Sequence, residues 1–139
     1  MGVRHYKELF AWQTGQAFKL EVYRLVGSSK GASRNFRYRD QILDAARGVP
    51  ASIVEGFRRC SPGDFARFLD YSIASLAEAE EDLHDGIRLD YFPAAECQPA
   101  FKLAFRCNRA CVRLKQSQIR YLNDLRERRR TKPRRLARS

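Results

Sequence analysis

Apolar side chains recur every three or four residues along most of this chain, which is the spacing of one face of an α-helix. Four segments carry such a stripe, at about residues 6–25, 35–57, 62–89 and 96–125. No segment shows the alternating pattern of a strand. We therefore predict an all-α fold, an antiparallel up-down four-helix bundle over residues 1–125.

The stripe of the last segment alternates steps of three and four over three heptads, as is typical of helices that pack nearly parallel in bundles. Its members are Ala104, Cys107, Cys111, Leu114, Gln118, Tyr121 and Leu125.

The connections between these segments carry clear turn signals. The sequence GSSKGAS separates the first two helices, and its glycines and serines predict a break. Before the third helix, Ser61, Pro62 and Asp64 are suited to an N-cap, a first-turn proline and an acid at the positive helix end. The helices should therefore be joined by short connections.

The second helix contains the unusual sequence RGVPASIVEGFRR, at residues 47–59. A proline inside a helix costs roughly 3 kcal/mol, and Pro50 interrupts an apolar stripe made of Ile42, Ala46, Val49, Ile53 and Phe57. We expect Pro50 to shape a surface that meets a neighbouring subunit, the alternative being a tolerated kink.

Three other residues in this sequence also have predicted structural roles. Gly48 would ease the close approach of another helix. Gly56 should end the helix in a left-handed conformation, and Glu55 should pair with Arg58, Arg59 or an arginine of another subunit, unless it stays unpaired.

Aromatic residues are numerous, with nine Phe, six Tyr and one Trp. They fall on more than one face of several helices, and a lone four-helix core cannot bury all of them. Because large aromatic side chains are enriched at interfaces, we predict self-association. The candidate interface residues are Pro50, Glu55, Gly56, Phe57, Phe101 and Phe105.

The positive charge is concentrated at the C-terminus. The chain has a net charge of +11, and residues 126–139 contain eight of its 27 Lys and Arg but only one of its 16 acids. Like charges in a block repel one another, so we predict a flexible basic tail over residues 126–139 that contacts nucleic acid. The alternative is a solvated end that only promotes solubility. The candidate nucleic-acid-binding residues are a patch on the second helix, Arg37, Arg39, Arg47, Arg58 and Arg59, and the tail residues Arg126, Arg128, Arg129, Arg130, Lys132, Arg134 and Arg135.

No catalytic motif is visible. The chain lacks a phosphate-binding glycine loop, a GxSxG elbow and an HExxH motif. Its best metal candidate is Glu81-x-x-His84, but di-iron bundles use two such motifs. Cys107 and Cys111, one turn apart, could place two thiolates on one face, yet structural zinc needs four ligands. We predict no catalytic residue, metal or cofactor, and we interpret Glu78, Glu80, Glu81, Asp82 and Asp85 as a solvated face.

Neither a transmembrane run nor a signal-peptide core is present in the sequence, so a cytoplasmic location is expected.

Several motifs resemble a known family of small bacterial four-helix bundle proteins, found as reading frames in the intervening sequences of large-subunit ribosomal RNA genes. They are YKELFAWQ in the first helix, Gln41-x-x-x-Ala45-Ala46 and VPASIVEGF in the second, and FARFLDYSIASLAEAEEDL in the third. The family's proline-containing second helix, which ends in a Glu-Gly pair and an arginine, is matched by Pro50, Glu55, Gly56 and Arg59. The resemblance covers about residues 6–125.

The resemblance implies a cytoplasmic bacterial protein without known enzyme activity that assembles as a ring-shaped homopentamer. It also implies a relation to the accessory variability proteins of diversity-generating retroelements, which partner a reverse transcriptase and bind nucleic acid. Three positions depart from the family pattern, where arginine, asparagine and glycine are usual: Asp44, Ser52 and Ala74. Any ligand site that the family builds from those residues would be altered in this chain.

These observations predict a non-enzymatic, homo-oligomeric module that binds nucleic acid, RNA in preference to DNA, through its basic surface and tail. In the second helix Phe36, Tyr38 and Phe57 lie between the arginines, where they could stack on unpaired bases. The alternative is an oligomeric protein adaptor that docks an enzyme such as a reverse transcriptase, with nucleic acid secondary.

Overall fold

A computed structural model describes residues 2–133, and all regular structure within that range is helical. A short 3₁₀ helix, η1 (Tyr6–Glu8), precedes five α-helices, and the predicted all-α fold is confirmed. The α-helices are α1 (Phe10–Ser28), α2 (Lys30–Arg34), α3 (Phe36–Arg58), α4 (Pro62–Arg88) and α5 (Ala94–Thr131).

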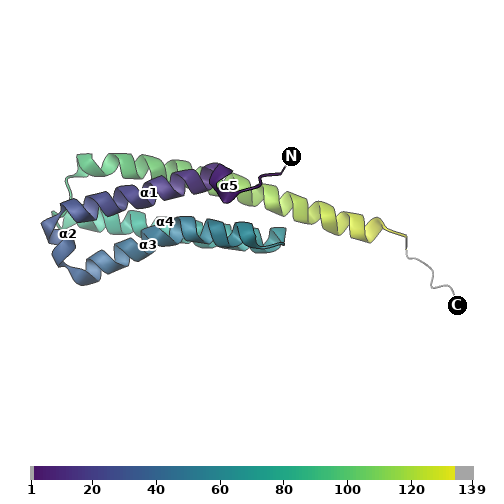
Figure 1. Cartoon of the computed structure of the whole chain (residues 1–139), viewed down its shortest axis with the longest axis horizontal. Coiled ribbons are helices and arrows are strands. Elements are labelled where there is room, and N and C mark those ends of the chain that lie inside the picture. Colours follow the sequence, from purple (N-terminus) through teal and green to yellow (C-terminus); the bar gives the residue numbers. More distant parts are fainter. Residues whose placement is uncertain (1, 134–139) are drawn as a thin grey trace.

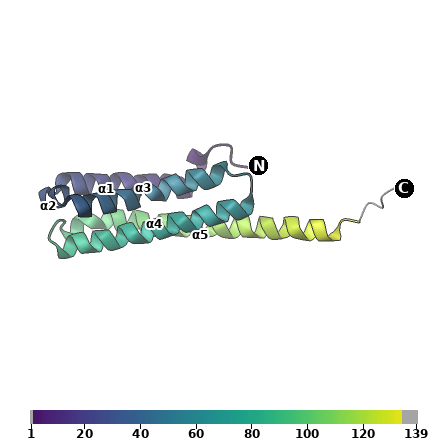
Figure 2. The ribbon, with the colours of Figure 1, turned by 90° about the horizontal axis from the view of Figure 1, so that it is seen from below.

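The four long helices lie side by side and alternate in direction along the chain, as Figures 1 and 2 show. Each of them packs against two others: α1 on α3, α3 on α4, α4 on α5, and α5 on α1. The helices therefore enclose a single core in up-down order.

The core consists of the predicted apolar stripes. Each long helix buries one stripe, because residues three and four apart share a face that can be removed from water. Two predicted members, Phe57 and Leu114, are only partly buried at the edge of the core. The largest fully buried side chains include Phe18, Val22 and Leu25 of α1, Ile42, Val49 and Ile53 of α3, Leu69, Leu76 and Leu83 of α4, and Cys97, Cys107 and Cys111 of α5.

Helix α5 is longer than its neighbours and extends past the end of the bundle (Figures 1 and 2). Its last buried residue in the described chain is Cys111, and Tyr121, which was predicted to belong to the inner stripe, is exposed. The prediction is wrong there because the neighbouring residue Leu122, and not Tyr121, faces the start of α4, where its Cδ2 lies 3.5 Å from the position of a Cβ at Gly63. Although α5 has 38 residues, neither it nor any other helix of the described chain is apolar enough to cross a membrane.

Helix α5 also continues past residue 125, where the sequence predicted a basic tail to begin. Residues 126–131 form its last turns, and Lys132 is its C-cap. The remaining part of the predicted tail, residues 134–139, lies outside the described residues.

The predicted start of α4 is confirmed. The Ser61 hydroxyl accepts a hydrogen bond from the Asp64 backbone N–H at 3.3 Å, and Pro62 occupies the first turn. The GSSKGAS segment is more ordered than a simple break, because α2 forms within it. There the Ser29 hydroxyl accepts from the backbone N–H of Ala32 at 3.1 Å and caps this short helix.

The prediction that Gly56 ends the second helix in a left-handed conformation is wrong. Gly56 lies inside α3, and no glycine among residues 2–133 has a positive φ. A Cβ atom at this position would lie 2.8 Å from the Cβ of Phe68 and 3.0 Å from Cδ1 of Phe65. The glycine is therefore needed for the close approach of α4 rather than for a turn.

The predicted role of Gly48 is confirmed, because a Cβ there would lie 2.8 Å from the Ser75 hydroxyl on α4. Pro50 lies between these two glycines and is buried inside its own chain. One residue before it, the Val49 carbonyl accepts a hydrogen bond from the buried Ser72 hydroxyl at 2.7 Å. The unusual α3 sequence thus serves packing against α4 within one subunit.

Candidate nucleic-acid interface

The five arginines predicted as a patch on the second helix all lie on α3 or at its C-terminal cap, and three of them are paired with acids. Arg39 Nη2 lies 3.1 Å from Asp40 Oδ1, Arg47 pairs with Asp44, and Arg59 Nη2 lies 2.8 Å from Glu55 Oε1. The last contact confirms the predicted pairing of Glu55. Three carboxylates therefore offset much of the positive charge of this patch.

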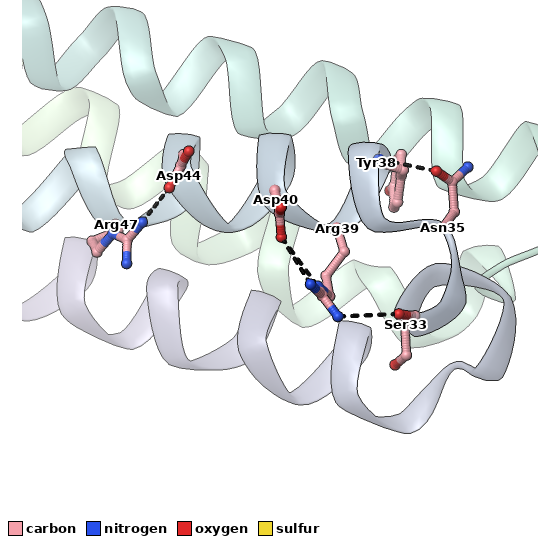
Figure 3. A network of polar contacts seen from close by, with 7 residues as sticks. All are labelled: Ser33, Asn35, Tyr38, Arg39, Asp40, Asp44 and Arg47. Carbon is pink, nitrogen blue, oxygen red and sulfur yellow. Dashed lines mark hydrogen bonds and ion pairs between the residues drawn. The ribbon is translucent and has the colours of Figure 1, made fainter.

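The pairs of Arg47 and Arg59 follow from local helix spacing, since residues three or four apart on a helix are neighbours. Figure 3 shows Arg47 beside Asp44, and Arg39 between Asp40 and the Ser33 carbonyl, to which its Nη1 donates at 3.4 Å. Asp44 places a negative charge beside Arg47 and so lowers the net charge of this surface.

Of the three aromatic residues expected to stack on bases beside these arginines, one is freely exposed. Phe36 is exposed, and the guanidinium carbon of Arg39 lies 4.7 Å from the centre of its ring. Tyr38 donates its hydroxyl to the Asp82 carbonyl at 2.6 Å, and Phe57 packs edge-on against Phe65. These two rings serve the fold.

The predicted tail bases are carried by the protruding end of α5. Arg126, Arg128 and Arg129 form no ion pair within the described chain, whereas Arg130 Nη2 lies 3.0 Å from Glu127 Oε1. Lys132 is exposed at the helix cap. Arg134 and Arg135 lie outside the described residues.

A second set of bases on α5 was not predicted. Steps of four, three, four and seven put these residues on one face of the helix, and none of them forms an ion pair with a described residue. This spacing could have revealed the basic face from the sequence. The face is hard to notice because its bases alternate with the apolar stripe and lie outside the charged block at the C-terminus. The set consists of Lys102, Arg106, Arg109, Arg113 and Arg120.

The predicted interface residues are not brought together. Pro50 and Gly56 are buried in the chain, Phe57 is partly buried, and Glu55 pairs with Arg59.

The two phenylalanines of α5 that were predicted for the interface differ from each other. Phe101 is partly buried, and it stacks on His84 with the ring centres 4.6 Å apart. Phe105 is exposed, so it alone of the three predicted phenylalanines presents most of its ring to solvent.

The interpretation of the α4 acids as a solvated face is wrong for Asp82. It is only 5% exposed, and its Oδ1 accepts a hydrogen bond from Gln41 Nε2 at 2.9 Å. Its Oδ2 is buried and has no hydrogen-bond partner among the described residues. Burial raises the pKa of this carboxyl above its usual range, because the charged form loses solvation.

The candidate metal ligands are used in other ways. Glu81 Oε1 lies 3.5 Å from Arg88 Nη1, and the His84 ring stacks on the Phe101 ring. Cys107 and Cys111 are buried with their sulfur atoms 4.0 Å apart, and a hydrogen bond to Cys111 together with burial raises the pKa of the Cys107 thiol. Within residues 2–133, no three His, Cys, Asp or Glu side chains are grouped so that they could hold a metal ion.

Residues 7–113 match the family model described as 23S rRNA-intervening sequence protein. The chain belongs to this family. No curated protein sequence matches the chain.

The family match covers α1–α4 and the first half of α5. It therefore includes the buried core of the described chain and ends at Arg113, before the point where α5 leaves the bundle, because Lys115 Nζ still lies 2.8 Å from Asp70 Oδ1 of α4. Arg120 and the terminal bases of the protruding end lie beyond the matched residues. Those bases are thus an addition to the part that matches the family.

Proposed function

We propose that this family member is a non-enzymatic, homo-oligomeric protein that binds nucleic acid, with RNA preferred over DNA. The observation that carries the proposal is the row of bases on α5 that lack acidic partners among the described residues. Lys and Arg side chains that neutralise phosphates release counterions, which drives binding without regard to sequence. The preference for RNA draws its support from the ribosomal RNA context in the name of the family.

The geometry of α5 favours contact with a long, charged polymer. The helix extends beyond the other three (Figure 1), so its terminal bases can be approached from several sides. The arginines of α3 contribute less, since their carboxylate partners already compete for the guanidinium groups. We therefore assign most of the affinity to α5 rather than to the patch on α3.

Binding of a single-stranded RNA across a salt series tests this assignment. A variant with Arg126, Arg128 and Arg129 changed to Gln should bind more weakly, and the slope of log K against log salt should fall by about 2, or about 0.7 for each phosphate that is no longer neutralised. A matched variant with Arg39, Arg47 and Arg59 changed to Gln loses the same charge and should change the slope less. Absence of binding by the unaltered chain at low salt would refute the proposal.

An adaptor function is the second candidate, favoured by the exposed apolar side chains on α5. Phe105, Val112 and Ile119 are all exposed and stand seven residues apart, on one face of the helix. Such a face suits another subunit or a partner such as a reverse transcriptase. A protein that co-purifies at high salt would favour this function, because ionic contacts with nucleic acid weaken steeply as salt rises.

Assembly into a ring-shaped homopentamer belongs to the same proposal, as the resemblance to the family implies. The exposed apolar side chains of α5, including Val112 and Ile119, supply a surface that association would cover. Light scattering of the purified chain tests the assembly, with five times the mass of one chain as the expected result.

A further inference from the structure

The surface where the start of α1 meets the middle of α5 contains an exposed aromatic hollow of about 350 Å³. Two phenylalanines from different helices supply its rings, and both are more than half exposed: Phe10 at 57% and Phe105 at 62%. The lining residues are Phe10 of α1 and Phe105, Arg106, Arg109, Ala110 and Arg113 of α5. Two large apolar rings therefore stand open to solvent on one part of the surface.

The aromatic hollow continues into a second one along α5. The neighbouring hollow is also about 350 Å³, and it shares Phe10, Ala110 and Arg113 with the first. Its other lining residues are Leu9, Ala11 and Leu114. The two hollows form one continuous surface depression, which we call the Phe10–Phe105 furrow.

The furrow is positively charged. Arg106, Arg109 and Arg113 line it, no acidic residue of the described chain does, and none of the three arginines forms an ion pair with a described residue. The guanidinium carbon of Arg109 lies 5.7 Å from the centre of the Phe105 ring. Exposed aromatic rings therefore lie directly beside unpaired guanidinium groups.

This combination fits an unpaired nucleic-acid strand better than a duplex. A single strand presents the faces of its bases, which stack on aromatic side chains, together with phosphates that bind guanidinium groups. A duplex keeps its bases stacked on one another and offers only its phosphates and groove edges. Exposed phenylalanines would then add nothing to binding, whereas the arginines would still contribute.

We propose that the Phe10–Phe105 furrow binds single-stranded nucleic acid, with bases stacked on Phe10 and Phe105 and the flanking phosphates bound by Arg106, Arg109 and Arg113. This inference rests on the proposed function and adds to it the class of ligand and the place where it binds. The protruding end of α5 contributes charge to any nucleic acid, while the furrow selects unpaired strands.

Substitution of Phe105 tests the furrow, using a labelled oligouridine and a DNA duplex of equal length as probes. Phe105→Ala should weaken binding of oligouridine roughly tenfold, since stacking on an aromatic side chain contributes about that much or more for each base, and should leave duplex binding unchanged. Tyr71→Ala is the matched control, because Tyr71 is also an exposed aromatic residue and lies on α4, outside the furrow. It should change neither affinity.

Two further variants separate stacking from apolar contact. Phe105→Tyr keeps an aromatic face and should retain oligouridine binding, whereas Phe105→Leu keeps apolar bulk and should lose it. Equal affinities of all Phe105 variants for oligouridine would overturn the inference. Loss of oligomeric mass in light scattering with Phe105→Ala, but not with Phe105→Leu, would also overturn it, in favour of a second copy of the chain in the furrow.

The outcomes also separate this inference from the proposed function. If the unaltered chain binds neither probe at low salt, the proposed function fails and the furrow assignment fails with it. If the chain binds both probes and Phe105→Ala changes neither affinity, the furrow assignment alone fails.

Discussion

The arginines of α3 and those of α5 belong to the same residue type but have different surroundings. On α3, Arg39, Arg47 and Arg59 each lie beside a nearby carboxylate of the same segment. On α5, Arg106, Arg109 and Arg113 have no acidic partner within the described chain and lie beside exposed aromatic rings. The difference shows that the number of bases on a helix is a poor guide to its free charge, because acids close by in the sequence neutralise it.

The two helices differ in packing as well. Helix α3 contacts both α1 and α4 and buries its apolar stripe along most of its length. Helix α5 buries residues only up to Cys111 within the described chain, and its last turns extend beyond the bundle. Helix α3 is thus mainly a structural element, whereas the second half of α5 is a surface available to other molecules.

The largest effect should come from comparing matched isoleucines of the two helices. Ile53→Ala on α3 removes a side chain that is 0% exposed, and it should lower the free energy of unfolding by about 2–5 kcal/mol because a cavity remains. Ile119→Ala on α5, where the side chain is 38% exposed in the single chain, should change it by about 0.5 kcal/mol or less when the protein is diluted until it is monomeric. Urea denaturation of both variants measures the difference, and similar losses would contradict the division between the two helices.

A smaller loss of stability is expected from Gly56→Ala. The new Cβ would lie 2.8 Å from the Phe68 Cβ, so α3 and α4 must separate, at a cost of about 1–3 kcal/mol. Gly27→Ala on α1 is the control, because a Cβ there meets nothing within 4 Å. It should raise stability by up to about 1 kcal/mol, through the greater helix propensity of alanine. A stabilised Gly56→Ala protein would disprove the packing role of this glycine.

Removing the acids of α3 tests whether they are the reason why this helix has less free positive charge than α5. A variant with Asp40→Asn, Asp44→Asn and Glu55→Gln frees three arginines and should bind RNA a few-fold more tightly at low salt. The slope of log K against log salt should become steeper, by about 0.7 for each additional phosphate that an arginine neutralises. Exposed ion pairs are worth only about 0.2–1 kcal/mol each, so thermal unfolding should change little. An unchanged salt slope would mean that α3 does not face the nucleic acid at all.

The smallest effect concerns Asp82, an acid that is buried rather than paired with an arginine. Its pKa is raised in the folded chain, so the folded protein binds a proton more tightly than the unfolded one. This residue therefore adds stability as the pH falls from above its raised pKa towards its usual value of 3.8. Asp82→Asn keeps an acceptor for Gln41 and removes the titration.

The measurement for Asp82 is the difference in unfolding free energy between the original protein and Asp82→Asn across that pH range. The difference should shift in favour of the original protein as the pH falls. A constant difference for Asp82→Asn would show that its carboxyl titrates normally in the folded state.

The fold and part of the candidate site were predictable from the sequence. Ile42, Ala46, Val49 and Ile53 repeat at the spacing of one helix face, and all four are buried. Ser61 and Pro62 marked the start of α4, and Glu55 has an arginine four residues away that pairs with it. These features depend on contacts within one or two turns of a helix, where sequence distance and spatial distance agree.

Other features depend on how the helices meet. Gly56 has the sequence context of a helix end, and only the position of Phe68 on α4 reveals its role in packing. Asp82 lies in a run of acids, and its burial accompanies the contact with Gln41 of α3. The furrow joins Phe10 to Phe105, which are far apart in the chain and line one hollow because α1 packs on α5.

The sequence by itself therefore determined which segments are helices, which face of each is apolar and where most of the positive charge lies. Helical periodicity, capping residues and charge are local properties of a chain, so they can be read from residue order alone. Only the tertiary structure decided which arginines are left unpaired beside exposed rings and where α5 leaves the bundle. Those properties depend on the lengths and relative positions of helices whose contacts join residues far apart in the chain.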